Sequence, residues 1–170
     1  MITLDIVQEG GDWDSLGDVT AVCAAAAEEA GRVGGARDGE ASLLLTDDDA
    51  LRQLNRRWRG QDHPTNVLSF PAADMPAGKG RKQLGDIAVA FETLTREARE
   101  AAKTPADHLA HLVVHGILHL LGLDHLHGDE ADAMEALEIE VLAAMGIANP
   151  YAGTVPADDA NGAAAPAEMT

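Results

Sequence analysis

The stretch HLVVHGILHLLGLDH, which runs from His111 to His125, decides both the fold and the chemistry that we expect of this chain. Its apolar residues recur at the spacing of a buried helix face, and His115 and His119 lie four residues apart on one side of that helix. Gly122 can end the helix and turn the chain, which brings His125 back towards the other two imidazoles. Three histidines in this arrangement predict a metal site with one open position, as in catalytic zinc centres.

The spacing H-x-x-x-H-x-x-G-x-x-H is also that of the metzincin proteases, with one difference. Those proteases carry a general-base glutamate directly after the first histidine, where this chain has Gly116. The motif therefore predicts hydrolytic metal chemistry without the ordinary metzincin mechanism. Because three neutral imidazoles leave the full charge of Zn²⁺ in place, bound water can approach a pKa of about 7 and a phosphodiester oxygen is attracted.

Other titratable residues near this motif have less specific interpretations. His108 and His111 continue the histidine face towards the helix start, and we expect His111 to support the site or the fold. His63 and His127 are expected in exposed loops, and Asp124 either orients an imidazole or caps a turn. The acidic residues of the last helix are expected on its solvent-exposed face; these are Glu130, Asp132, Glu135, Glu138 and Glu140.

Hydrophobic periodicity predicts four short strands early in the chain and helices that cluster late. The expected strands are residues 2–8, 41–45, 66–70 and 86–91, and the expected helices are residues 16–30, 47–58, 92–103, 104–121 and 129–145. Gly31 is the expected end of the first helix and Thr46 the expected N-cap of the second, while Thr104 and Pro105 start the fourth. This order indicates an α+β fold in which about five helices pack on a small four-stranded sheet.

A chain of 170 residues has the size of one domain, which we expect to span residues 1–149. Residues 150–170 are rich in Ala, Gly, Pro and Asp without periodicity, which predicts a disordered tail. The single cysteine, Cys23, excludes an internal disulfide framework and is expected in the core. No signal peptide and no run of 18 apolar residues is visible, so we expect a cytoplasmic protein.

The net charge of −17 argues against a nucleic-acid partner, but its distribution argues for one. Seven of the 12 basic residues lie between positions 52 and 82 with only two acids, so this window carries +5. Such a basic island can hold phosphates, or it can be the solvated face of a helix and a loop. Within it, Arg59 lies at the end of the second helix beside Gly60 and can reach a phosphate with a bidentate fork, whereas Trp58 is expected to pack.

Three sequence blocks, in this order, resemble the bacterial YbeY family of endoribonucleases, also called rRNA maturation factors. They are LNRRWRGQDHPTNVLSFP (54–71), LGDIAVA (84–90), and the histidine stretch followed by EADAMEALEIEVL (130–142). The resemblance covers about residues 1–147 and implies a small mixed sheet flanked by helices, with a zinc-hydrolase-like metal helix. Leu123 departs from it, since the family commonly has Tyr there, and so does the acidic extension after residue 149.

The resemblance implies that one zinc ion is held by His115, His119 and His125, and that Arg59 lies in the same cleft and takes part in RNA cleavage with His115. It further implies single-strand-specific cleavage, maturation of the 16S rRNA 3′ end, ribosome quality control, and the small ribosomal subunit, ribosomal protein S11 and an Era-type GTPase as partners. Two alternatives stay open: a non-catalytic ribosome-assembly factor with a structural metal and, less favoured, a metalloprotease. The general base is unassigned, because Gly116 cannot serve as one.

Overall fold

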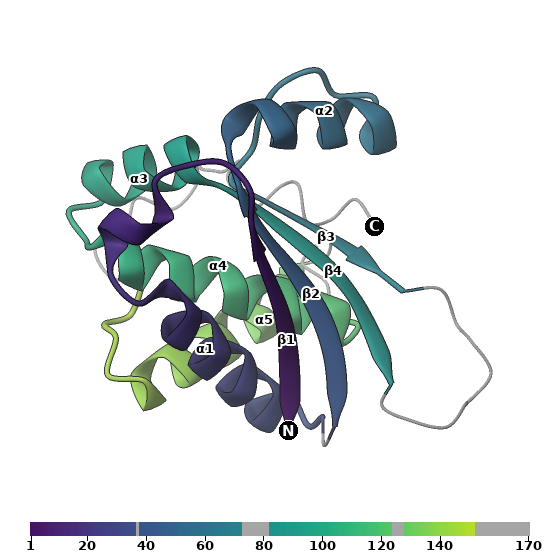
Figure 1. Ribbon diagram of the computed structural model, residues 1–170. Helices are drawn as coiled ribbons and strands as arrows, with labels where there is room; N and C mark the ends of the chain where they lie inside the picture. The colour runs from purple at the N-terminus through teal and green to yellow at the C-terminus, as the bar shows by residue number, and fades with distance from the viewer. Residues whose placement is uncertain (37, 73–81, 124–127, 152–170) are drawn as a thin grey trace.

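The computed structural model describes residues 1–36, 38–72, 82–123 and 128–151, without the side chains of residues 128–130 (Figure 1). Its four strands form one sheet in the order β1-β2-β4-β3; they are β1 (Ile2–Gln8), β2 (Gly39–Thr46), β3 (Val67–Pro71) and β4 (Gln83–Ala90). β1, β2 and β4 run parallel, while β3 pairs antiparallel with β4 at one edge. The predicted α+β class with a small mixed sheet is therefore confirmed.

Five α-helices accompany the sheet, as expected. They are α1 (Val19–Val33), α2 (Asp48–Arg59), α3 (Phe91–Glu100), α4 (Pro105–Leu120) and α5 (Gly128–Ala144), and a 3-10 turn, η1 (Trp13–Leu16), precedes them. α1 and α4 pack against each other and against the sheet, and α5 packs on both of them (Figure 1). Among the described helices, none combines the length and the apolar character that a membrane span requires.

The two faces of the sheet are covered by different helices. Val67 and Ile87 belong to the main hydrophobic core with residues of α1 and α4. Their strand neighbours Leu68 and Ala88 belong instead to a smaller cluster with Leu51 of α2. Because successive residues of a strand point to opposite sides, α2 and α4 lie on opposite faces of the sheet.

Helix α4, which carries the histidines of the motif, is buried over most of its length. The hydroxyl of Thr104 accepts a hydrogen bond from the backbone N–H of Asp107 at 3.1 Å, and Pro105 occupies the first turn, as predicted. Nearly every side chain from His108 to Leu120 is buried. The histidine side of α4 is therefore covered by other elements of the chain and is not a solvent-exposed face.

Several predicted helix boundaries are wrong, two of them for reasons of packing and capping. α1 continues through Gly31 to Val33, because the missing side chain of Gly31 lets Ile2 approach; an added Cβ would lie 2.3 Å from Cγ1 of Ile2. Asp47, not Thr46, caps α2, and its carboxylate accepts from the N–H of Ala50 at 2.9 Å. The first helix also begins three residues later than expected, after the turn of residues 13–16, and α3 ends at residue 100.

Candidate metal and RNA sites

Helix α4 brings His115 and His119 together on its buried side. Their ring centroids are 5.8 Å apart, and both residues are almost fully buried. One helical turn separates them, so their rings lie next to each other on one face, as the spacing predicts. Two imidazoles in this position can act as neighbouring ligands of one metal ion.

A buried carboxylate, Glu138 of α5, holds this histidine cluster. Nδ1 of His115 lies 2.7 Å from one oxygen of Glu138, and Nε2 of His111 lies 2.7 Å from the other. The hydroxyl of Tyr151 donates a further hydrogen bond to Glu138, which is only 1% exposed. The expectation that Glu138 lies on the solvent face of the last helix is therefore wrong.

A sequence signal for the burial of Glu138 exists but is weak. Glu138 lies four residues after Met134 and four before Leu142, and all three are buried on the inner side of α5. This i, i+4 spacing places Glu138 in an apolar row rather than among the acidic residues around it. What the spacing does not provide is the partner, because the histidines that bind Glu138 belong to a different helix.

The electrostatics of the cluster favour an ionised Glu138. Burial acts to raise the pKa of this carboxyl, but His115 and His111 outweigh it and hold the pKa below its usual value. Burial and the neighbouring Glu138 raise the pKa of the Tyr151 hydroxyl, which stays protonated and donates. An ionised Glu138 accepts hydrogen bonds only, so Nδ1 of His115 is the donor, and in the neutral imidazole this tautomer leaves the lone pair on Nε2.

The donor set of this cluster fits a metal ion. A metal-binding histidine usually donates its other ring N–H to a carboxylate, as His115 does here. The Nε2 atoms of His115 and His119 are buried and form no hydrogen bond within the described part of the chain. His125, the third expected ligand, lies outside the described residues together with Asp124 and His127, and the described residues alone contain no group of three metal ligands.

His108 supports the start of α4 and is not part of this cluster. Its Nε2 lies 2.8 Å from an oxygen of Glu97 in α3, and the same oxygen accepts from the side-chain amide of Asn66 at 2.9 Å. Burial lowers the pKa of His108, and the hydrogen bond to Glu97 only partly opposes this. His108 therefore links α4 to α3 and to the segment before β3 as a neutral group.

The other expected site residue, Arg59, lies on the opposite face of the sheet. It is the last residue of α2 and lines a groove of about 880 Å³ between α2 and the open part of the sheet. The groove is lined from four strands and α2 by Asp5, Val7, Glu9, Ser42, Leu43, Leu44, Leu54, Trp58, Arg59, Phe70, Pro71, Asp86, Ile87 and Ala88. The structure thus separates Arg59 from His115 and His119 by the sheet.

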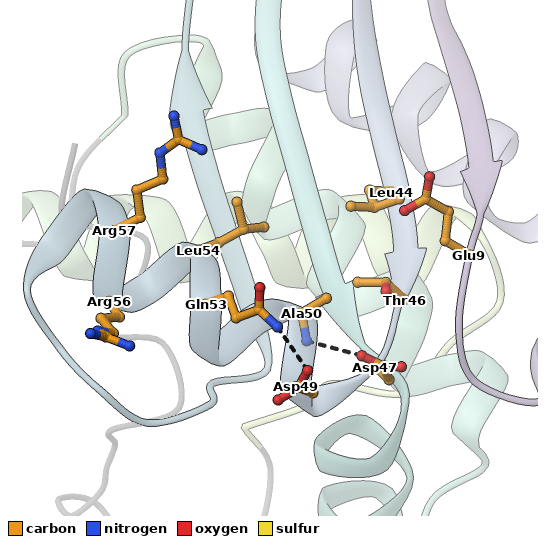
Figure 2. Close-up of a pocket in the computed structure, with 10 residues that line it drawn as sticks. All are labelled: Glu9, Leu44, Thr46, Asp47, Asp49, Ala50, Gln53, Leu54, Arg56 and Arg57. Carbon is orange, nitrogen blue, oxygen red and sulfur yellow. Dashed lines mark hydrogen bonds between the residues drawn. The ribbon is translucent and has the colours of Figure 1, made fainter.

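Some basic residues of the island are paired with carboxylates, and others lie in or near the groove. Arg52 forms salt bridges with Asp49 and Asp62 at 3.2 and 2.8 Å, so its charge is compensated at the surface. Figure 2 shows a neighbouring pocket that shares Glu9, Leu44 and Leu54 with the groove, and in it Arg56 and Arg57 extend from the same end of α2 in different directions. The last turn of α2 therefore brings three cationic side chains together, those of Arg56, Arg57 and Arg59.

Comparisons with known proteins place these features in a family. A family model described as Endoribonuclease YbeY matches residues 15–146. Over 152 residues the chain is 51% identical to the Endoribonuclease YbeY of Azorhizobium caulinodans, which covers 88% of this chain and 96% of that protein. The corresponding protein of Parvibaculum lavamentivorans is 45% identical over 164 residues, or 91% of this chain and 88% of that one. The solution structure of TM1509 from Thermotoga maritima is similar as well, with 27% identity, a TM-score of 0.55, and coverage of 94% of this chain and 100% of that one.

Proposed function

This chain belongs to the endoribonuclease YbeY family, and from that premise we propose that it is a zinc-dependent, single-strand-specific endoribonuclease. Its proposed substrate is precursor ribosomal RNA, and its proposed roles are maturation of the 16S rRNA 3′ end and ribosome quality control. The names of the relatives support the reaction class. The observation that supports the metal is the hydrogen bond between Nδ1 of His115 and the buried carboxylate of Glu138.

In this proposal, His115, His119 and His125 hold the zinc ion. Bound Zn²⁺ would supply Lewis acidity towards a phosphodiester oxygen and lower the pKa of a water molecule. Glu138 fixes the ring orientation and the tautomer of His115, which leaves Nε2 directed away from α5. Because Glu138 also binds His111 and Tyr151, the carboxylate itself cannot turn without breaking further hydrogen bonds.

The position of the metzincin glutamate is closed by packing. Gly116 lies against β4, and an added Cβ would lie 2.9–3.2 Å from three carbon atoms of Ile87, which is buried. A side chain at position 116 would therefore meet the sheet and not the reacting groups. We assign no general base to this chain, and Arg59 is proposed to bind a phosphate of the RNA from the α2 side.

The proposed partners follow from the proposed substrate. They are ribosomal RNA and the small ribosomal subunit, with ribosomal protein S11 and an Era-type GTPase as protein contacts in the cytoplasm. The acidic balance of the chain outside residues 52–82 supports selective binding, because it repels polyanions that do not meet the basic island.

The proposal is tested by RNA cleavage with matched histidine variants. Purified protein is expected to contain about one zinc ion per chain, measured by elemental analysis, and to cleave a single-stranded RNA faster than its duplex. His115→Ala and His119→Ala are expected to lose both zinc and cleavage, whereas His63→Ala, a variant of an exposed loop histidine, retains both. Cleavage that persists in the His115 variant would reveal a contaminating nuclease and refute the proposal.

The end groups of the products distinguish two chemical routes. A 2′,3′-cyclic phosphate requires attack by the ribose 2′-OH and therefore a base that remains to be assigned. A 5′-phosphate with a free 3′-hydroxyl indicates attack by water, for which the metal site alone suffices.

A further inference from the structure

The groove between α2 and the sheet exposes an aromatic side chain that a folded protein would ordinarily cover. Trp58 is 61% exposed, although its position in the helix led us to expect a packing residue. The described residues contain three exposed large hydrophobic side chains, Met1, Val7 and Trp58, and two of these line this one groove. Apolar exposure concentrated at one place indicates a binding surface more than scattered single residues do.

The surroundings of Trp58 form a set of planar groups. The ring of Phe70 in β3 lies 6.4 Å from the Trp58 ring, and the guanidinium carbon of Arg57 lies 5.2 Å from its centroid. Leu54 and Ala88 extend this surface as an apolar floor. Aromatic rings with an adjacent arginine are the groups on which proteins stack unpaired nucleobases.

Charge is distributed asymmetrically across the groove. Arg59 and the neighbouring Arg57 come from α2, whereas the carboxylates that line the groove come from the sheet and its edge: Asp5 of β1, Glu9 just after β1, and Asp86 of β4. A phosphate backbone is attracted to the arginine side and repelled by the carboxylates. The exocyclic amino groups of bases can instead donate hydrogen bonds to these carboxylates, so a strand would lie with its backbone along α2 and its bases over the sheet.

We propose that this groove is a single-stranded RNA subsite in which an unpaired base stacks on Trp58 while Arg57 and Arg59 bind the adjacent phosphates. The proposal rests on the proposed function and names a part of the substrate-binding surface on the face opposite the histidines. The groove volume of about 880 Å³ is enough for a nucleotide. A duplex does not fit this arrangement, because its bases are already stacked and paired.

Tryptophan fluorescence provides a direct test, because the chain has only two tryptophans. Trp13 is buried against Phe91, so a Trp13→Phe variant leaves Trp58 as the single reporter. The ligand is a short 2′-O-methyl oligonucleotide, which withstands 2′-OH attack, offered as a single strand and as a duplex. Saturable quenching by the single strand and weak quenching by the duplex are expected.

Variants at position 58, made in the natural background and followed by fluorescence anisotropy of a labelled oligonucleotide, separate stacking from apolar contact. Trp58→Ala is expected to raise the Kd roughly 5- to 150-fold, whereas Trp58→Phe retains most of the affinity. Trp58→Leu is the matched control, because it keeps an apolar side chain without a ring, and it is expected to resemble the alanine variant. Thermal unfolding checks that the variants fold, which the exposure of Trp58 favours.

The outcomes separate this proposal from the proposed function. If the protein cleaves RNA but the Trp58 signal and the Kd of Trp58→Ala are unchanged, the subsite is refuted while the function stands. If single strands bind at Trp58 without any cleavage, the subsite stands and the nuclease activity is refuted. Quenching by a basic peptide that displaces the oligonucleotide, or full affinity of Trp58→Leu, would identify a protein-docking groove and overturn the proposal.

Discussion

Glu138 is a buried carboxylate whose two oxygens are shared among His111, His115 and Tyr151. A charge at 1% exposure is tolerated only when hydrogen bonds replace the lost water, and these three donors do so. The residue therefore serves the fold and the proposed metal site together. The effect of a substitution at position 138 therefore has to be measured separately on folding stability and on metal affinity.

Glu138→Gln is expected to weaken zinc binding roughly 10- to 100-fold. The amide keeps the shape of the side chain but loses the negative charge that holds the Nδ1 proton of His115. Competition with a chromophoric chelator measures the affinity, and thermal unfolding shows whether the variant is folded. Glu140→Gln is the matched control on the exposed side of the same helix. Equal zinc affinity of the two variants would contradict the assigned role of Glu138.

His108 is expected to make the protein less stable as the pH falls below about 6.5. Burial lowers the pKa of His108 in the folded state, so below the ordinary value of 6.5 the unfolded chain binds more protons than the folded one. His108→Gln can still donate to Glu97 but does not titrate, and it should reduce this loss of stability. The measurement is the free energy of unfolding in urea above and below pH 6.5, with the exposed His63→Gln as control. The same pH dependence in His108→Gln and the natural protein would exclude His108 as its source.

Helix α2 is fixed mainly at its N-terminal end. Asp47 caps the helix, and the carboxylate of Asp48 accepts from the backbone N–H and the hydroxyl of Thr93 in α3, at 3.1 and 2.7 Å. Only Leu51 and Asn55 of this helix are buried. The end that carries Trp58 and Arg59 therefore has no buried residue after Asn55, and it lines the groove.

Asp47→Ala is expected to destabilise the protein by about 1 kcal/mol, because the N–H of Ala50 loses its acceptor. Asp47→Ser keeps an oxygen that can cap the helix and should restore most of this stability. Urea unfolding of the two variants and the natural protein compares the three free energies. A loss for Asp47→Ser as large as that for Asp47→Ala would mean that the cap is not what Asp47 contributes.

At the level of elements, helix starts that depend on neighbouring residues are predicted well, whereas contacts between segments far apart in the sequence are not. Thr104 and Pro105 start α4 as expected, because an N-cap and a first-turn proline act within a few residues. Gly31 was the expected end of α1, but the contact with Ile2, far away in the sequence, makes glycine useful inside the helix. The partners of Glu138 were missed for the same reason, since three segments must pack before the carboxylate meets the histidines.

Across the whole molecule, the sheet separates the two surfaces that are proposed to meet RNA. His115 and His119 lie in the layer of α4, while Trp58 and Arg59 lie on α2 at the opposite face. The sequence places the residues of both surfaces correctly in their helices but does not reveal this separation. It follows from the alternation of side chains in β3 and β4, which only the strand register determines.

Removal of the metal is expected to lower the thermal stability of the whole chain. A ligand that binds only the folded state stabilises it by about 2.7 kcal/mol at a free concentration of 100 times its Kd. Differential scanning calorimetry with zinc and with excess chelator should therefore show a lower Tm after chelation. His119→Ala serves as control, since its Tm should not respond to either addition. A natural protein whose Tm is the same in both conditions would argue against a metal bound by the folded state.

The close packing of Gly116 in α4 against Ile87 in β4 makes the size of one residue depend on the size of the other. A larger residue at 116 requires a smaller one at 87, so related chains should vary at these two positions together or not at all. A glutamate at 116, as in the proteases with the same histidine spacing, would have to be accompanied by a change in the sheet. The residues allowed at position 116 are thus limited first by the space beside Ile87 and only then by the chemistry of the site.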